Sequence, residues 1–268
     1  GFTRVGGTGS VAIGEGANTG SIDVVALEGA SIVNNGAVGS ETEFDYLFAS
    51  SNTQEGATVT VSSMDGADSS FNRVQTATSI GSTASIIVGD GASVSGFVEA
   101  RGFESADVRI DGAVGNDAFN SNVAAISRSS DFEGMDTSTT VGSVSTSGFS
   151  QASATVGGAA SVDVGETGSV TGGVQAIGFA GATIELDGAV GTEASPSFVV
   201  ASSRGTNSTF SQNNTFDSST GASDFAQSSN NSSTGSDASI AIGETGLVNG
   251  FVEANADGNA SVSNDGEV

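Results

Sequence analysis

The sequence predicts an all-β repeat fold, a β-solenoid (β-helix) built from units of about 76 residues. Three observations support this class. One segment recurs at a nearly constant spacing, short runs alternate small apolar with polar residues, and large side chains are scarce. A string of tandem β-sandwich modules, one per unit, is the alternative. A sandwich usually needs more large core residues per sheet, so the solenoid is favoured.

The recurring segment is clearest from Ser85 to Gly115, which reads SIIVGDGASVSGFVEARGFESADVRIDGAVG. Related copies begin at Ser10, Ser161 and Ser239, so the interval between successive starts is nearly constant. A period held this closely predicts a repeat architecture. We therefore divide the chain into an N-terminal arm or cap (1–9), repeat units 10–84, 85–160 and 161–238, and a partial fourth unit (239–268).

The composition indicates a thin, tightly stacked core. The chain has 40 Gly and 15 Phe but one Tyr and no Trp, so burial must come from many Val, Ile and Ala side chains. The single proline, Pro196, leaves nearly every backbone N–H available to a hydrogen-bonded ladder. Because the chain has no Cys, stability must come from this ladder and from packing.

The first half of each unit contains two strand-length runs, each ending at a glycine. The first set of glycines is Gly14, Gly89, Gly165 and Gly243, and the second is Gly36, Gly112, Gly188 and Gly266. We interpret both sets as turns that end strands. Within a unit, Asp90-Gly91 recurs as Asp111-Gly112, and this spacing of about 21 residues is typical of one solenoid coil. It predicts three to four coils per unit and a rod of about a dozen coils, roughly 60 Å long.

The second half of each unit is predicted to be β-structure with loops. The segment NVAAISRSS at Asn122 matches SFVVASSRG at Ser197, and Arg128 and Arg204 are 76 residues apart, so the repeat includes this half. The stretch 206–238 is rich in Ser, Asn and Thr and nearly free of aliphatic residues. Its composition leaves two structures open, an exposed loop or a polar rung of the stack.

The charge of the chain is strongly acidic. It has 31 Asp and Glu against 6 Arg, with no Lys and no His, and a net charge of −25. Such a surface repels phosphate backbones, which argues against nucleic-acid binding. Salt or divalent cations relieve the self-repulsion, so we expect an extracellular or cell-surface location. The interior of a high-salt organism is the alternative.

The residue inventory argues against an enzyme. Without His, Cys or Lys the usual nucleophile and base pairs cannot be built. Carboxylates are plentiful, but the aromatic platforms that usually hold sugars are nearly absent, so a polysaccharide-acting enzyme is a distant alternative. We assign no catalytic or cofactor-binding residue.

Acidic turn residues are the candidate metal ligands. Asp90, Asp111, Glu166 and Asp187 recur at matching places, and carboxylates stacked in successive coils repel unless a cation such as Ca²⁺ bridges them. The alternative is that Asp-Gly and Glu-Gly form good turns with solvated side chains. No Asp-x-Asp-x-Asp-Gly loop is present.

The phrases VGDGASVSGFVEA (Val88 to Ala100) and IGETGLVNGFVEA (Ile242 to Ala254) resemble the coils of bactofilin-type polymerising β-solenoids. They are also similar to coils of bacterial autotransporter passengers and other surface adhesins. The resemblance covers only the first part of each unit, the recurring segment itself. It implies self-association through coil ends or edges, and it transfers no active site.

These features predict a non-enzymatic structural protein that self-assembles head-to-tail into an extracellular filament, sheath or surface layer. The fourth unit breaks off at Val268, and an uncapped coil can stack on another molecule, with Gly1 to Gly9 adding a strand to the joint. The alternative is an adhesin stalk or passenger that binds another cell, surface or glycan. Phe97 and Phe251 share one repeat position, which indicates a structural role at a coil corner or in the core. The sequence predicts no membrane span.

Overall fold

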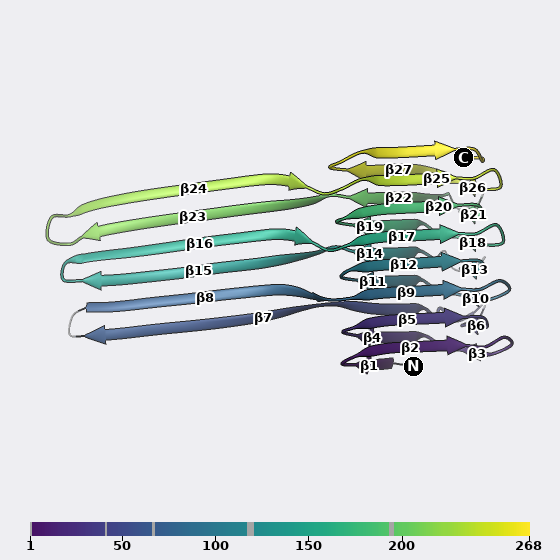
Figure 1. Cartoon of the computed structure of the whole chain (residues 1–268), viewed down its shortest axis with the longest axis horizontal. Coiled ribbons are helices and arrows are strands. Elements are labelled where there is room, and N and C mark those ends of the chain that lie inside the picture. The colour runs from purple at the N-terminus through teal and green to yellow at the C-terminus, as the bar shows by residue number, and fades with distance from the viewer. Residues whose placement is uncertain (1, 41, 66–67, 117–120, 193–195) are drawn as a thin grey trace.

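The computed structural model describes residues 2–40, 42–65, 68–116, 121–192 and 196–268. All regular elements in these ranges are β-strands, and the chain winds as a stack of coils with the N- and C-terminal coils at opposite ends (Figure 1). The predicted all-β solenoid is confirmed. The described ranges contain no helix long and apolar enough to cross a membrane.

Each coil has three sides, and each side adds one strand to a parallel ladder. The first side consists of β1 (Phe2–Val5), β4 (Ile22–Ala26), β7 (Leu47–Asp65), β11 (Val98–Gly102), β14 (Val123–Ser127), β19 (Val174–Gly178), β22 (Ser197–Ser203) and β27 (Gly250–Ala256). The second side consists of β2 (Thr8–Ile13), β5 (Gly29–Asn34), β9 (Thr83–Val88), β12 (Ser105–Ile110), β17 (Ala159–Val164), β20 (Gly181–Leu186), β25 (Ala238–Ile242) and β28 (Ala260–Asn264). The third side has two-residue strands: β3 (Asn18–Thr19), β6 (Ala37–Val38), β10 (Ser93–Val94), β13 (Ala113–Val114), β18 (Ser169–Val170), β21 (Ala189–Val190) and β26 (Leu247–Val248).

The core follows from the alternation along each strand. Inward positions carry Val, Ile or Ala and stack in register on the equivalent residue of the next coil, as Ile86 does on Val108. Both side chains are buried, whereas the neighbouring Ile87 and Arg109 point outward. Small branched side chains suit this arrangement because a thin triangular core has no room for aromatic rings.

Each repeat contains two coils, not the predicted three to four. Thr83 pairs with Ser105, whereas Ser105 pairs with Ala159, which is more than twice as far along the chain. The repeat therefore alternates a short coil with a long coil. The prediction was wrong because it assigned the whole unit to coils, while more than half of each long coil lies outside the stack.

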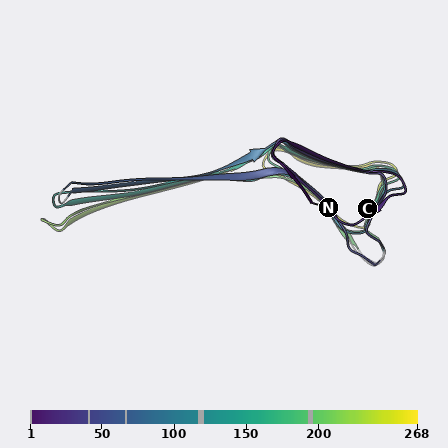
Figure 2. The ribbon, with the colours of Figure 1, turned by 90° about the horizontal axis from the view of Figure 1, so that it is seen from below.

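The extra residues of the long coils form three β-hairpins that leave the stack between the first and second sides (Figures 1 and 2). Their strands are β7 from Asn52 onward, β8 (Asp68–Gly81), β15 (Ser129–Val141), β16 (Val144–Val156), β23 (Gly205–Asp217) and β24 (Ala222–Thr234). They pair antiparallel in the order β7-β8-β15-β16-β23-β24. We call this six-stranded sheet the fin.

The fin decides the structure of the polar stretch 206–238. It is neither an exposed loop nor a rung of the solenoid, because most of it forms the antiparallel strands β23 and β24. Ser, Thr and Asn suit a sheet in which both faces meet water. The ladder supplies the backbone hydrogen bonds, and side chains add cross-strand bonds such as Ser211 Oγ to Ser228 Oγ at 2.8 Å.

The predicted N-terminal arm belongs to the first coil. Phe2–Val5 is β1, which pairs in parallel with β4, and Gly1 lies outside the described residues. The chain then turns directly into β2 through Gly6 and Gly7, with no hairpin at this corner. The long strand β7 therefore forms one edge of the fin.

Candidate functional site

The predicted metal ligands Asp111 and Asp187 lie in one column at the corner after the second side. The residues of this column, in coil order, are Gly14, Asn35, Gly89, Asp111, Gly165, Asp187, Gly243 and Asp265. The Asn35, Asp111 and Asp187 side chains each lie over the glycine of the next coil: a Cβ on Gly165 would be 2.3 Å from Asp111 Oδ1, and one on Gly243 would be 1.9 Å from Asp187 Oδ1. The two carboxylates are thus two coils apart, or about 10 Å.

Asp90 and Glu166 occupy exposed turn positions in two different coils. The turns that contain them, between β9 and β10 and between β17 and β18, are longer than the turns that contain Asp111 and Asp187, so Asp90 and Glu166 are not at the column position, which Gly89 and Gly165 occupy. In the described part of the chain, no group of three or more Asp, Glu, His or Cys side chains lies close enough to hold a metal ion. Calcium binding by these four residues stays a prediction.

Asp111 forms an ion pair with Arg109, which lies two residues before it at the end of the second-side strand β12. Arg109 Nε lies 2.7 Å from Asp111 Oδ2, and Arg109 Nη1 lies 3.1 Å from Asp163 Oδ2 in the next coil. Burial raises the pKa of Asp163, Arg109 opposes that rise, and Asp111 and Asp187 add to it. The guanidinium therefore offsets the repulsion between coils that a cation was predicted to relieve.

The aromatic residues at this repeat position lie at the start of the first side, outside the core. The ring centroids of Phe97 and Tyr46 are 4.7 Å apart, and those of Phe251 and Phe198 are 6.1 Å apart. Phe97 is half-buried and Phe251 is exposed. Phe97 lies at the corner before β11, and Phe251 is the second residue of β27, so neither ring fills the core.

A buried serine lies at the root of each hairpin. Ser51, Ser127 and Ser203 occupy the same position in successive repeats and are at most 1% exposed. Ser127 Oγ donates to the Phe103 carbonyl of the coil below at 3.0 Å and accepts from the Gly158 N–H, where the hairpin re-enters the coil, at 3.0 Å. The other two serines repeat both bonds. One hydroxyl thus joins both ends of each hairpin to the stack.

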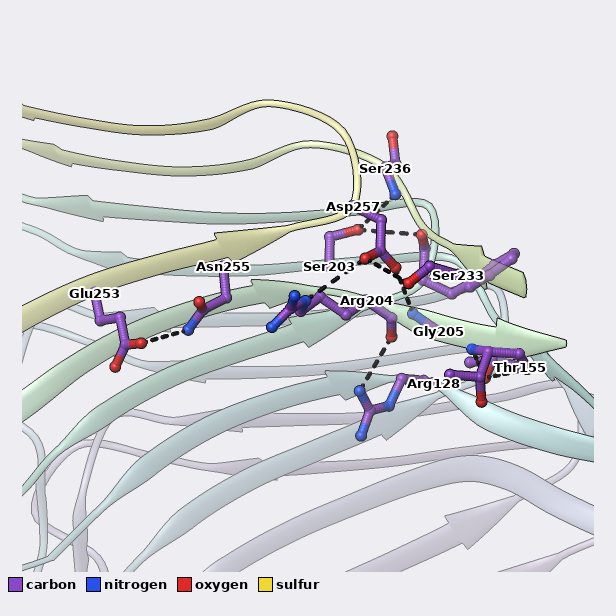
Figure 3. A network of polar contacts seen from close by, with 12 residues as sticks. Arg128, Thr155, Ser203, Arg204, Gly205, Ser233, Ser236, Glu253, Asn255 and Asp257 are labelled. Atoms are coloured by element: carbon purple, nitrogen blue, oxygen red, sulfur yellow. Dashed lines mark hydrogen bonds and ion pairs between the residues drawn. The ribbon is translucent and has the colours of Figure 1, made fainter. Parts of the chain in front are cut away.

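The third root carries an additional charged network (Figure 3). Asp257, from the coil above, accepts from the Gly205 N–H at 3.1 Å and from Ser233 Oγ at 2.9 Å, and lies 3.6 Å from Arg204 Nε. These contacts, with the Gly205 N–H foremost, lower the pKa of Asp257. Arg128 of the second root donates to the Arg204 carbonyl at 3.1 Å, which links the two roots.

We expect Ser127→Ala to destabilise the protein by about 1–3 kcal/mol, because it leaves a partly buried carbonyl and a partly buried N–H without their shared partner. Urea unfolding measures the loss, and hydrogen exchange should locate it at the second root. Ser147→Ala, at an exposed position of the same hairpin, is the matched control and should unfold like the wild type. Equal effects of the two substitutions would contradict the proposed anchoring.

The hairpin tips are joined by aspartates. Asp68 of the first hairpin accepts from the Gly142 N–H of the second at 2.9 Å. Asp217 of the third accepts from Ser143 Oγ of the second at 2.9 Å and from Ser219 Oγ at 2.7 Å. The hydrogen bonds from Ser219, followed by that from Ser143, lower the pKa of Asp217 to about 2.

The lowered pKa of Asp217 predicts the pH below which the contact between the second and third hairpin tips is lost. Because the folded-state pKa lies below the ordinary value of 3.8, the stabilising contribution of Asp217 is present above that pH and is lost as the pH falls through about 2. An NMR titration of the carboxyl carbon should show a midpoint near 2. Ser219→Ala should move the midpoint upward, and an unchanged midpoint would contradict this assignment of the hydrogen bonds.

Four hollows of the described surface lie on the fin and at its base, away from the acidic turns. One of them is lined by Phe71, Phe149 and the ion pair Arg73–Asp136, whose Nη2 and Oδ2 atoms are 2.5 Å apart. Sequence reasoning missed the fin. A signal was present, because Gly142-Ser143 between Val141 and Val144 is typical of a two-residue hairpin turn.

Comparison of the chain with protein-family models, with curated proteins and with solved structures finds no match.

Proposed function

We propose that the protein is a non-enzymatic structural subunit that self-assembles head-to-tail into an extracellular filament, sheath or surface layer. The observation that carries this proposal is the uniform register of the stack. Every strand of the second side from β2 to β28 pairs in parallel with the next, residue for residue. Coils that are equivalent by translation can continue from one molecule to another with the same contacts.

The surface chemistry supports a structural role outside the cell. A net charge of −25 keeps single molecules apart at low ionic strength, and salt screens that repulsion. The coil phrases at Val88 and Ile242, which resemble those of polymerising β-solenoids, favour association along the stack. Arg109 lies between Asp111 and Asp163 of the next coil and offsets their repulsion, so we expect assembly to proceed without calcium.

Negative-stain electron microscopy of the concentrated protein in seawater-like salt tests the proposal. We expect filaments of uniform width, and we expect them to persist in a calcium chelator at matched ionic strength. Isolated rods under every condition would overturn the proposal. Loss of the filaments on chelation would keep the filament and make the acidic turns cation sites.

The second candidate is an adhesin stalk or passenger, and the fin favours it specifically. The hairpins project to one side of the solenoid and present two faces beyond the body of the rod (Figure 2). Selective binding of the purified protein to cells or glycans, without filaments, would support this candidate.

A further inference from the structure

The two faces of the fin differ in composition. Successive residues of a strand point to opposite faces, and paired residues of neighbouring strands point to the same face. Phe71 pairs with Ser138, Ser138 with Ser147, Ser147 with Asn214 and Asn214 with Phe225, so both rings lie on one face. The same rule places every phenylalanine of the fin there: Phe71, Phe132, Phe149, Phe210, Phe216 and Phe225. We call this the aromatic face.

The charges of the fin lie almost entirely on the opposite face, the acidic face. Its acidic residues are Glu55, Asp65, Asp68, Asp131, Glu133, Asp217 and Asp224. The aromatic face carries only Arg73 and Asp136, which neutralise each other as an ion pair. In a chain with a net charge of −25, a neutral face of this kind stands out.

The rings of the aromatic face meet solvent in the isolated chain. Phe71 and Phe149 are each 37% exposed, Phe216 is 46% exposed and Phe225 is 57% exposed. Four of the fin strands are 13 residues long, and six strands form the sheet. At standard strand dimensions the face measures about 44 Å by about 29 Å, or about 1,300 Å². Its other side chains are mostly Ser, Thr, Asn and Gln, so the gathered rings are its apolar part, and exposed apolar side chains gathered on one face mark interaction sites.

We propose that two copies of the protein pair through their aromatic faces, as a β-sandwich of two fins. A second copy is the partner whose face has the same size and twist, and facing sheets pack about 10 Å apart. With full overlap such a pair buries up to about 2,600 Å² in total, which exceeds the roughly 1,600 Å² of a standard stable interface. It also brings two strongly acidic chains together at their neutral surfaces, with the acidic faces outward.

The aromatic face has a hollow that fits this packing. The hollow lined by Phe71, Phe149, Arg73 and Asp136 can receive one ring of the partner. A ring in this hollow is close to the Arg73 guanidinium, so a cation–π contact can add to the packing. A two-fold axis makes the contact occur twice, and an axis parallel to the stack places the two rods at opposite ends of the sandwich.

The natural chain has no Cys, so single thiols can report on each face. Ser138→Cys places a thiol on the aromatic face, and Thr139→Cys places one on the acidic face at the next residue; both positions are exposed in the isolated chain. In concentrated protein that sedimentation shows to be dimeric, we expect maleimide to label Ser138→Cys at least about tenfold more slowly than in dilute monomer. Labelling of Thr139→Cys should stay within about twofold of its monomer rate, because its face remains open to solvent.

A second pair of variants measures the contact itself. Phe149→Glu introduces a charge into the aromatic face and should raise the dimer Kd at least about tenfold. Val61→Glu adds the same charge to the acidic face, where Val61 is 63% exposed, and should leave the Kd within about threefold. Circular dichroism of both variants verifies that the fin is folded.

A chain that stays monomeric at every concentration overturns the pairing, as does a dimer in which both thiols remain reactive or both are protected. This inference is independent of growth along the stack. Dimers with a protected Ser138→Cys thiol and no filaments support the pairing and contradict the filament. Filaments in which that thiol stays reactive support the filament and overturn the pairing.

Discussion

Replacement of Gly188 by Ala is expected to lower the stability of the stack by about 3 kcal/mol, with a fall of about 10 °C in the thermal midpoint. Gly188 lies at the corner between β20 and β21, where the chain passes directly over the coil below. A Cβ at this position would lie 2.3 Å from the Gly168 carbonyl oxygen and 2.4 Å from that of Gly165. Both obstructing atoms belong to the backbone, so relief requires two coils to move apart.

The control for this substitution is Gly14→Ala. No heavy atom lies within 4 Å of a Cβ at Gly14, and its φ is not positive, so an added methyl is tolerated there. Calorimetry measures the thermal midpoints of both variants, and only Gly188→Ala should melt below the wild type. If Gly188→Ala melts with the wild type, the corner is not as closely stacked as described. Gly36, Gly112 and Gly266 meet backbone oxygens of the preceding coil in the same way, at 2.3 to 2.6 Å.

Ile86→Ala is expected to cost about 2–5 kcal/mol, because it removes most of a fully buried side chain from a core that cannot collapse around the cavity. Ile86 is 0% exposed and lies in register between Ile32 and Val108. The backbone ladders on both sides keep these coils at their fixed spacing, so the neighbours cannot move into the space.

The adjacent Ile87 provides a matched control with the same chemistry. It is 38% exposed on the outer face of β9, so Ile87→Ala should cost about 1 kcal/mol or less. Urea unfolding of the two variants compares them directly, and hydrogen exchange in β9 and β12 should show the opening only for Ile86→Ala. A larger loss for Ile87→Ala would mean that the faces of β9 are reversed.

For the candidate site, the sequence supplied the residues but not their distances. Arg109 and Asp111 are next-but-one neighbours on one strand end, so their ion pair follows from local geometry. The separation of Asp111 from Asp187 does not follow from local geometry. It depends on the intervening coil, which places Gly165 directly over Asp111. The serines at the hairpin roots were visible in the sequence at the spacing of the repeat, but nothing local marks Ser127 as buried rather than exposed.

The sequence by itself determined the all-β class, the long period and the small-residue core, since period-two alternation and glycine-ended runs are local properties of the chain. Only the tertiary structure decided that each repeat holds two coils and one hairpin, and that the hairpins join into a fin. The strands of the fin pair within each hairpin and also with the neighbouring hairpin, and contacts such as Ser143 to Asp217 link residues 74 positions apart. Polar strands of Ser, Thr and Asn carry no inward apolar pattern, so their structure depends on the neighbouring hairpin that each coil brings alongside.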